Sequence, residues 1–227
     1  RHLVEWADEL YQTEKELLIL SIERRSQLTF DLVHWIVHIT KILFAVSCSE
    51  VCDGHDRDKL RRSAHWLIYV FSWIPDDEET IKYIEMYRIA DNIFDAAVDA
   101  YRRGCDEEAF EIRDLLLNWT YKAGKYQTGW ATLEKACCGL ACLNLILEMP
   151  NERLLDDIDA YVAKEKVPAY DIRSRTAMSL HEEAEKYRTG YAHDAIDVAM
   201  SKVDQAKLRA LLHEIADHLL PEANNPD

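Results

Sequence analysis

The sequence predicts an all-α fold, and three observations support this prediction. Apolar residues recur at spacings of three and four along most of the chain, which is the period of a helix. The 227 residues include only 6 Gly and 5 Pro, which is little material for the tight turns of a sheet. With 48% hydrophobic and 30% charged residues, the chain can also bury a large core. We therefore expect a multi-helix bundle or stacked α-hairpins, with about ten helices and no sheet.

Residues 29–47, TFDLVHWIVHITKILFAVS, are apolar on nearly every face of the predicted helix. A helix that is apolar all round has to be buried, so this segment is predicted to be the central helix, entered at Thr29 as N-cap. Its interruption by polar residues argues against a membrane span, which requires at least about 18 consecutive apolar residues. We expect deep burial of five side chains: Trp35, Ile36, Ile39, Leu43 and Phe44.

The remaining helices follow from apolar spacing and from their end signals. Residues 2–25 have the pattern of an amphipathic surface helix. A helix over 56–74 is expected to be capped by Asp56 and stopped by Pro75. Residues 76–103 are predicted to form one long helix that begins with four acidic residues and ends at Gly104. Further helices are expected at 107–122, 128–148, 152–163, 172–188, 192–202 and 205–220.

The composition changes in the last third of the chain. All Trp, Phe and Cys residues lie before residue 143. We therefore predict a main helical core over residues 1–150 and a C-terminal helical layer over residues 151–227 packed on it. The first part is expected to keep a core by itself, and the second is not. Because the chain begins at Arg1 rather than Met, we also expect it to be part of a larger protein.

The balance of charged residues restricts the kinds of partner. The chain has 42 acidic and 27 basic residues, a net charge of −15. Nucleic acids and anionic membranes are bound through clustered Lys and Arg, so a protein partner, preferably a basic one, fits better. Six scattered Cys without a secretory signal are typical of reduced thiols in a cytoplasmic protein.

One acidic row is a candidate binding face for such a partner. Asp91, Asp95 and Asp99 are spaced by four and share a helix face in the most acidic part of the chain. A field of this sign would steer a basic partner. The alternative is a solvated face whose charge is balanced by three arginines, Arg88, Arg102 and Arg103.

A metal site is the second hypothesis, because Asp31, His34 and His38 share one face of the predicted central helix. Carboxylates and imidazoles are ligands of divalent metals, so the chain could alternatively be a metal-dependent hydrolase centred on this face. Otherwise these are core or interface histidines with hydrogen-bonded partners. No cofactor other than a divalent metal is suggested.

Two further sets have spacings that metal sites use. Cys48, Cys52 and His55 approximate zinc-ligand spacing, with His65 the nearest fourth ligand; the alternative is a polar turn with incidental thiols. His55-Asp56 also resembles the dipeptide of the HD phosphohydrolases.

Two other patterns belong to known enzyme families. Arg188 and His193 fit the Arg-x4-6-His spacing of HEPN ribonucleases, and this resemblance implies an all-helical ribonuclease as a further alternative. In HEIADH, residues 213–218, the two His are five apart, which excludes the zincin motif.

A repeated turn pattern suggests helical hairpins. Tyr101-x-x-Gly104, Tyr121-x-x-Gly124 and Tyr187-x-x-Gly190 each place an aromatic ring one turn before a glycine. The fifth residue after each glycine is small: Ala109, Gly129 and Ala195. The turns resemble those of tetratricopeptide repeats, which implies a stacked helical surface that binds a peptide or protein. The alternative is three independent helix C-caps.

These observations favour an α-helical interaction or regulatory domain, a scaffold that works through protein contacts. The acidic surface and the hairpin turns point to this function. No sequence pattern indicates a phosphate-binding glycine loop, a nucleophile elbow or a dinucleotide fingerprint, and we predict no catalytic residues.

Overall fold

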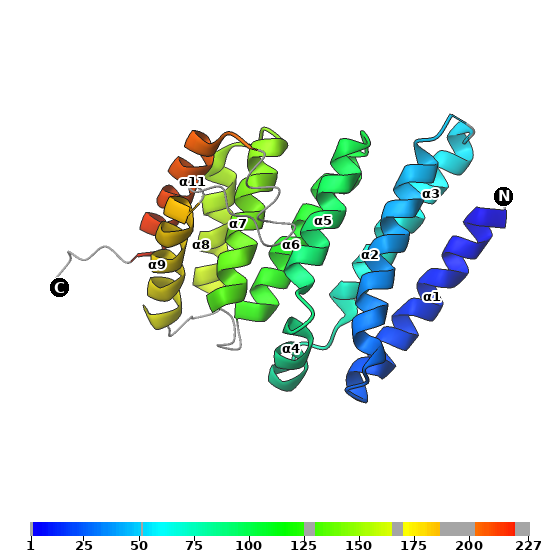
Figure 1. The fold of residues 1–227 in the computed structure, drawn as a ribbon, viewed down its shortest axis with the longest axis horizontal. Helices are drawn as coiled ribbons and strands as arrows, with labels where there is room; N and C mark the ends of the chain where they lie inside the picture. The colour runs from blue at the N-terminus through cyan, green and yellow to red at the C-terminus, as the bar shows by residue number, and fades with distance from the viewer. Residues whose placement is uncertain (1, 51, 125–129, 165–169, 187–202, 221–227) are drawn as a thin grey trace. The chain divides into compact units, whose positions relative to one another are not determined.

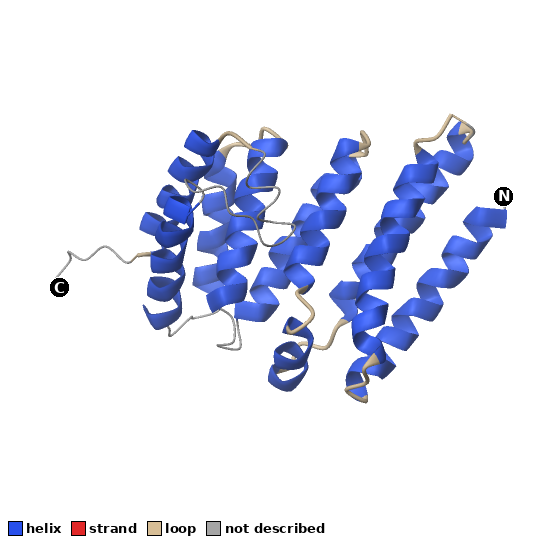
Figure 2. Ribbon diagram, viewed as in Figure 1, coloured by secondary structure: helices blue, strands red, loops and turns tan. Residues whose placement is uncertain are grey.

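The computed structural model describes residues 2–50, 52–124, 130–164, 170–186 and 203–220, and it confirms the all-α fold. These residues form ten α-helices and one 3-10 helix, and they contain no strand (Figure 2). Contacts divide the chain into unit 1, Arg1–Trp119, and unit 2, Thr120–Asp227. This division lies earlier than residue 150, and the independent stability of residues 1–150 stays a prediction.

Unit 1 is built around α2 (Leu28–Ser47), which packs against α1, α3 and α5 (Figure 1). The 3-10 helix η1 follows α3 directly, and α6 begins in unit 1. The bounds of these other elements are α1 (His2–Glu23), α3 (Gly54–Ile68), η1 (Tyr69–Trp73), α4 (Glu78–Glu85), α5 (Ile89–Arg102) and α6 (Asp106–Gly124).

The burial of α2 matches the prediction for four of the five side chains. Ile36 and Phe44 are completely buried, and Leu43 and Ile39 are nearly so. The prediction for Trp35 is wrong, because 58% of its surface is exposed. The contacts with three neighbouring helices leave one face of α2 uncovered, and Trp35 lies on that face.

Thr29 does not cap α2. Gln27 occupies the N-cap position without a side-chain cap bond. The Thr29 side chain is instead buried, and its hydroxyl donates to Ser21 Oγ at 3.1 Å. The Tyr83 hydroxyl of α4 lies 3.2 Å from Thr29 Oγ1, so Thr29 links three helices.

Aspartates cap both α3 and α4, and the cap of α3 lies earlier than predicted. Asp53, not Asp56, caps α3, and its Oδ1 accepts from the Asp56 N–H at 2.9 Å. Asp77 caps α4 in the same way through Thr80. The hydrogen bond from the Thr80 backbone N–H lowers the pKa of Asp77.

The long helix predicted over 76–103 is broken between α4 and α5. Arg88 adopts the left-handed conformation, with φ of 56°. The Asn92 side-chain amide donates to the carbonyls of Tyr87 and Arg88 at 3.0 and 2.9 Å and so satisfies groups that the break exposes. The break allows Ile84 of α4 and Ile93 of α5 both to be completely buried.

The Gly104 turn forms as the hairpin pattern predicts. Gly104 has a φ of 72°, and the Cys105 N–H donates to the Ala100 carbonyl at 3.0 Å, which closes the end of α5. In unit 2, Glu148 has a φ of 51° in the equivalent position after α7, although it is not a glycine. The repeat resemblance itself stays a prediction.

The described residues of unit 2 form the end of α6 and four further helices. The helices α9 and α11 pack against each other, and both contact α7. Three thiols, Cys137, Cys138 and Cys142, are buried on α7. The helix predicted at 192–202 lies outside the described residues. The bounds are α7 (Trp130–Ile146), α8 (Asn151–Lys164), α9 (Tyr170–Lys186) and α11 (Gln205–Leu219).

A matched pair of variants tests the packing of α2. Ile39→Ala removes a nearly buried side chain and should lower the free energy of unfolding by roughly 2–5 kcal/mol. Trp35→Ala, on the exposed face, should change it by less than about 0.5 kcal/mol. Urea denaturation of both variants measures the difference. Equal losses of stability would contradict the orientation of α2.

The two left-handed C-caps predict changes of opposite sign. Gly104→Ala should destabilise by roughly 1–2 kcal/mol, because only backbone strain opposes the added methyl group, which would meet no atom within 4 Å. Glu148→Gly should stabilise by about 0.5–1 kcal/mol, since it relieves the same strain. Chemical denaturation of the two variants checks both signs. A stability loss in Glu148→Gly would mean that its side chain contributes more than its backbone costs.

Candidate functional site

The structure places Asp31, His34 and His38 together on the exposed face of α2, as their spacing predicts. The His34 ring packs edge-on to Phe30, with ring centroids 4.4 Å apart. Among the described residues, however, no three His, Cys, Asp or Glu side chains are grouped so that they could hold a metal ion. The metal hypothesis therefore gains no support from this face.

The same face exposes large apolar side chains. Trp35 is 58% exposed, and Leu28, Phe30 and Ile42 are each 45–46% exposed. Together with the three polar residues above, these four form what we call the α2 stripe: Leu28, Phe30, Asp31, His34, Trp35, His38 and Ile42. Single exposed apolar residues are ordinary, but a contiguous row on one helix indicates an interaction surface.

Aromatic rings from the α4–α5 region extend the stripe at its N-terminal end. Phe30 lies 6.0 Å from the Tyr87 ring, and Tyr87 contacts Tyr83 in a T-shaped arrangement. The Tyr87 hydroxyl donates to the Tyr83 hydroxyl at 3.2 Å. This hydrogen bond raises the pKa of Tyr87 to about 12.

The predicted acidic row is held in ion pairs within unit 1. Asp91 pairs with Arg88 at 2.5 Å, and Asp95 pairs with Lys41 of α2 at 2.6 Å. Asp99 accepts two hydrogen bonds from Arg103, at 2.7 and 3.2 Å. The row thus stabilises α5 and its contact with α2, and the alternative of charge balanced by neighbouring cations describes it better than a free binding face.

A second aromatic cluster lies where α1 meets α3 and η1. The Trp66 ring lies within 6.5 Å of the rings of Tyr11, His65 and Tyr69. His65 Nε2 lies 3.1 Å from Glu111 of α6. Burial lowers the pKa of His65 and outweighs the opposite influence of Glu111. This histidine therefore belongs to the packing of α3 rather than to a metal site.

The thiols near the end of α2 are not arranged as the zinc spacing predicted. Cys48 lies 3.6 Å from Cys105, which is 57 positions away, while His55 is exposed in the first turn of α3. Arg61 of α3 approaches Cys48 to 3.9 Å. No local pattern in the sequence links Cys105 and Arg61 to Cys48, so neither was predicted to lie beside it.

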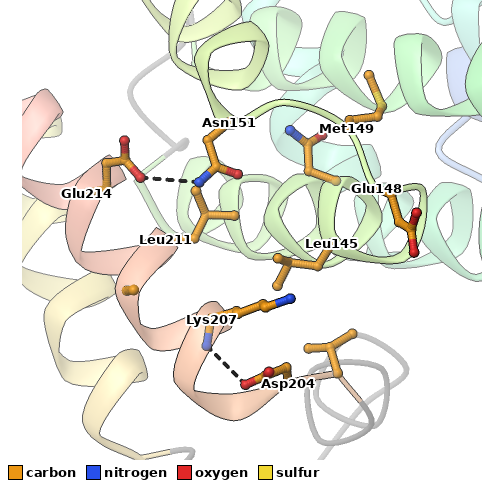
Figure 3. Close-up of a pocket in the computed structure, with 11 residues that line it drawn as sticks. Leu145, Glu148, Met149, Asn151, Asp204, Lys207, Leu211 and Glu214 are labelled. Carbon is orange, nitrogen blue, oxygen red and sulfur yellow. Dashed lines mark hydrogen bonds between the residues drawn. The ribbon is translucent and has the colours of Figure 1, made fainter.

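Unit 2 contains a cavity of about 580 Å³ at the ends of α7 and α11 (Figure 3). Its volume falls in the range of small-molecule sites, and Leu145 and Leu211 supply apolar surface. Asp204 caps α11 by accepting from two backbone N–H groups, and Asn151 donates to Glu214 at 3.4 Å. These polar groups at its edge serve the fold of unit 2.

Within HEIADH, His213 has a partner on another helix. His213 lies against His181 of α9, with their Nδ1 atoms 2.7 Å apart, and Asp217 lies 3.3 Å from His181. The predicted ribonuclease pair, Arg188 and His193, lies outside the described residues.

Comparison with known proteins gives no assignment. No known protein family, curated protein or solved structure matches the chain. The α2 stripe is thus judged on its own geometry.

The depressed pKa of His65 predicts a pH-dependent stability. Its imidazole favours the neutral form in the folded state, so the folded protein binds fewer protons than the unfolded chain, whose histidine pKa is about 6.5. The stability that neutral His65 contributes is present above a pH of about 6.5 and is lost as the pH falls below it. Relative to His65→Gln, wild-type protein should therefore lose stability between pH 7.5 and 5. Urea midpoints that run parallel for the two proteins would contradict this.

Proposed function

We propose that this protein is a helical interaction domain whose binding surface is the α2 stripe. The observation that supports the proposal is the exposure of Trp35, Phe30 and Ile42 on the most apolar helix of unit 1. Tryptophan at the centre of an apolar surface is typical of residues that dominate binding energy. The buried face of α2 fixes these side chains on a rigid element, which limits the entropy lost on binding.

The occupant that fits this surface is an amphipathic helix of a protein partner. Five positions of the stripe, 28, 31, 35, 38 and 42, alternate between spacings of three and four. Such spacing forms a seam along one helix that a second helix can follow. Trp35 occupies the middle of this seam. Leu28 and Ile42 lie seven residues, or about two helical turns, before and after it.

The partner helix should have basic residues beside its apolar seam. Unit 1 has 24 acidic and 14 basic residues, and it stays net negative after its ion pairs form, since each pair uses one acid and one base. Asp31 adds an acceptor within the stripe, and the exposed His34 and His38 add polar groups. This charge would speed association with a basic partner and would make the rate depend on salt, while the apolar contacts would supply most of the affinity.

A lipid surface fits the stripe less well. By length and composition, α2 is the one helix in the described residues that could cross a membrane, yet half of it is buried in unit 1. Inserting it would require breaking its packing with α1, α3 and α5. The excess of acidic residues also opposes binding to an anionic headgroup layer.

Paired variants test the proposed surface without requiring the partner to be known in advance. Trp35→Ser combined with Ile42→Ser should leave the fold intact, because both side chains are exposed. The double variant loses apolar contact surface and should lower partner retention at least tenfold, which corresponds to about 1.4 kcal/mol of binding free energy. Met178→Ser, which alters a side chain that is 63% exposed in unit 2, is the matched control. Crosslinking from a photoreactive residue at position 35, followed by quantitative mass spectrometry, identifies the bound protein and measures the loss.

The salt dependence of binding separates the possible occupants. Association with the crosslinked partner should slow as ionic strength rises. If purified wild-type protein instead sediments as a dimer and Trp35→Ser converts it to a monomer, a second copy covers the stripe and the proposed partner is wrong. Equal crosslinking yields from positions 35 and 178 would exclude the stripe as a binding surface.

A further inference from the structure

Two thiols from distant parts of unit 1 lie in contact. Cys48 occupies the C-cap position of α2, and Cys105 directly precedes α6. Their sulfur atoms are 3.6 Å apart. Cys48 is partly exposed, whereas Cys105 is completely buried. One thiol can therefore meet a reagent in solution while the other can be reached only from the first.

The surroundings of Cys48 favour its thiolate form. Partial burial alone would raise its pKa, but hydrogen bonds with Ser47 and Cys105 and the guanidinium of Arg61 outweigh this, and the pKa of Cys48 falls below its ordinary value. Arg61 Nη2 lies 3.9 Å from the sulfur. Thiolates are the nucleophilic form of cysteine, and a neighbouring arginine is a known cause of their stabilisation.

Cys105 has the opposite properties. Burial and the adjoining Cys48 raise the pKa of Cys105 to about 12, so it stays a protonated thiol while Cys48 is reduced. Two of these influences, the hydrogen bond with Cys48 and the charge of Cys48, disappear once Cys48 is modified. Arg61, which lowers the pKa of Cys105, remains. Modification of Cys48 thus lowers the pKa of Cys105, although burial, the largest influence, continues to raise it.

We propose that Cys48 and Cys105 form a thiol-modification site at which a small-molecule disulfide is reduced and an intramolecular disulfide is formed. The Cys48 thiolate attacks one sulfur of the reagent, forms a mixed disulfide and releases one thiolate. The Cys105 sulfur then attacks the Cys48 sulfur and forms the protein disulfide. The second half of the reagent leaves as a thiol and takes up the proton that Cys105 loses. The protein dithiol loses two electrons, and the reagent gains them as it becomes two thiols.

The geometry requires only a small movement. The sulfurs must approach from 3.6 Å to the bonded distance of roughly 2.05 Å, and each lies at the end of a helix or in a turn rather than within a helix. The product would join the end of α2 to the turn between α5 and α6. It would close a loop across α3, α4 and α5, which stabilises the folded state by restricting the unfolded chain.

The other cysteines do not share this arrangement. Cys137, Cys138 and Cys142 are buried in α7, and burial raises the pKa of each thiol. Cys52 is partly exposed, like Cys48, and lies four residues further along the chain, between α2 and α3. It is therefore a suitable control for general thiol reactivity.

The experiment uses the full reduced chain and glutathione disulfide as the probe. After timed incubation, free thiols are blocked with an alkylating reagent and the linked peptides are identified by mass spectrometry. The wild-type chain should yield a Cys48–Cys105 disulfide, and the Cys52→Ser variant should yield it at the same rate. Absence of this linkage in the wild-type chain, or a predominant Cys48–Cys52 linkage, would overturn the proposal.

Two variants separate the roles of the sulfurs. Cys105→Ser should stop at the mixed disulfide on Cys48, and Cys48→Ser should leave Cys105 unmodified. Arg61→Gln should slow alkylation of Cys48 several-fold at neutral pH and shift its pH profile upward, with little effect on Cys52. An unchanged pH profile in a folded Arg61→Gln variant, checked by circular dichroism, would contradict the activation of Cys48.

Discussion

The structure of unit 1 depends on the burial of one face of α2. Val33, Ile36 and Phe44 are completely excluded from water, and three helices cover them. Each such side chain contributes roughly 1.5–3 kcal/mol of transfer free energy, which is a large share of the stability of a domain of this size. The same rigid helix therefore supports both surfaces of interest, the α2 stripe along its exposed face and Cys48 at its end.

The sequence was sufficient to predict the helices but not their exposed faces. The apolar period identified α2 to within a residue or two of its ends, because periodicity is strongest in long segments. The exposure of Trp35 was missed because the prediction rested on the apolar residues of the segment, although Asp31, His34 and His38 mark the exposed face on which Trp35 also lies. The break at Arg88 was missed for another reason. The Asn92 contacts that stabilise the break have no distinctive pattern in the sequence.

The candidate sites show the same limit, since long-range pairings decide them. Lys41 reaches Asp95 from 54 positions away, so an acidic row that is regular in the sequence is neutralised in the fold. Cys48 and Cys105 are 57 positions apart, so the predicted zinc-spaced set grouped Cys48 with the nearer Cys52 instead. Local spacing predicted which side chains share a helix face, as for His34 and His38, but not which faces meet.

The stripe and the thiol pair lie on one helix yet impose different chemical requirements. A binding surface needs Trp35 to stay exposed, and its neighbours must not shift to cover it. The disulfide would bond only the last turn of α2 to the start of α6, more than two helical turns beyond Trp35. Because the stripe side chains lie on the part of α2 that α1, α3 and α5 hold in place, a disulfide at the end of the helix would leave them exposed as they are.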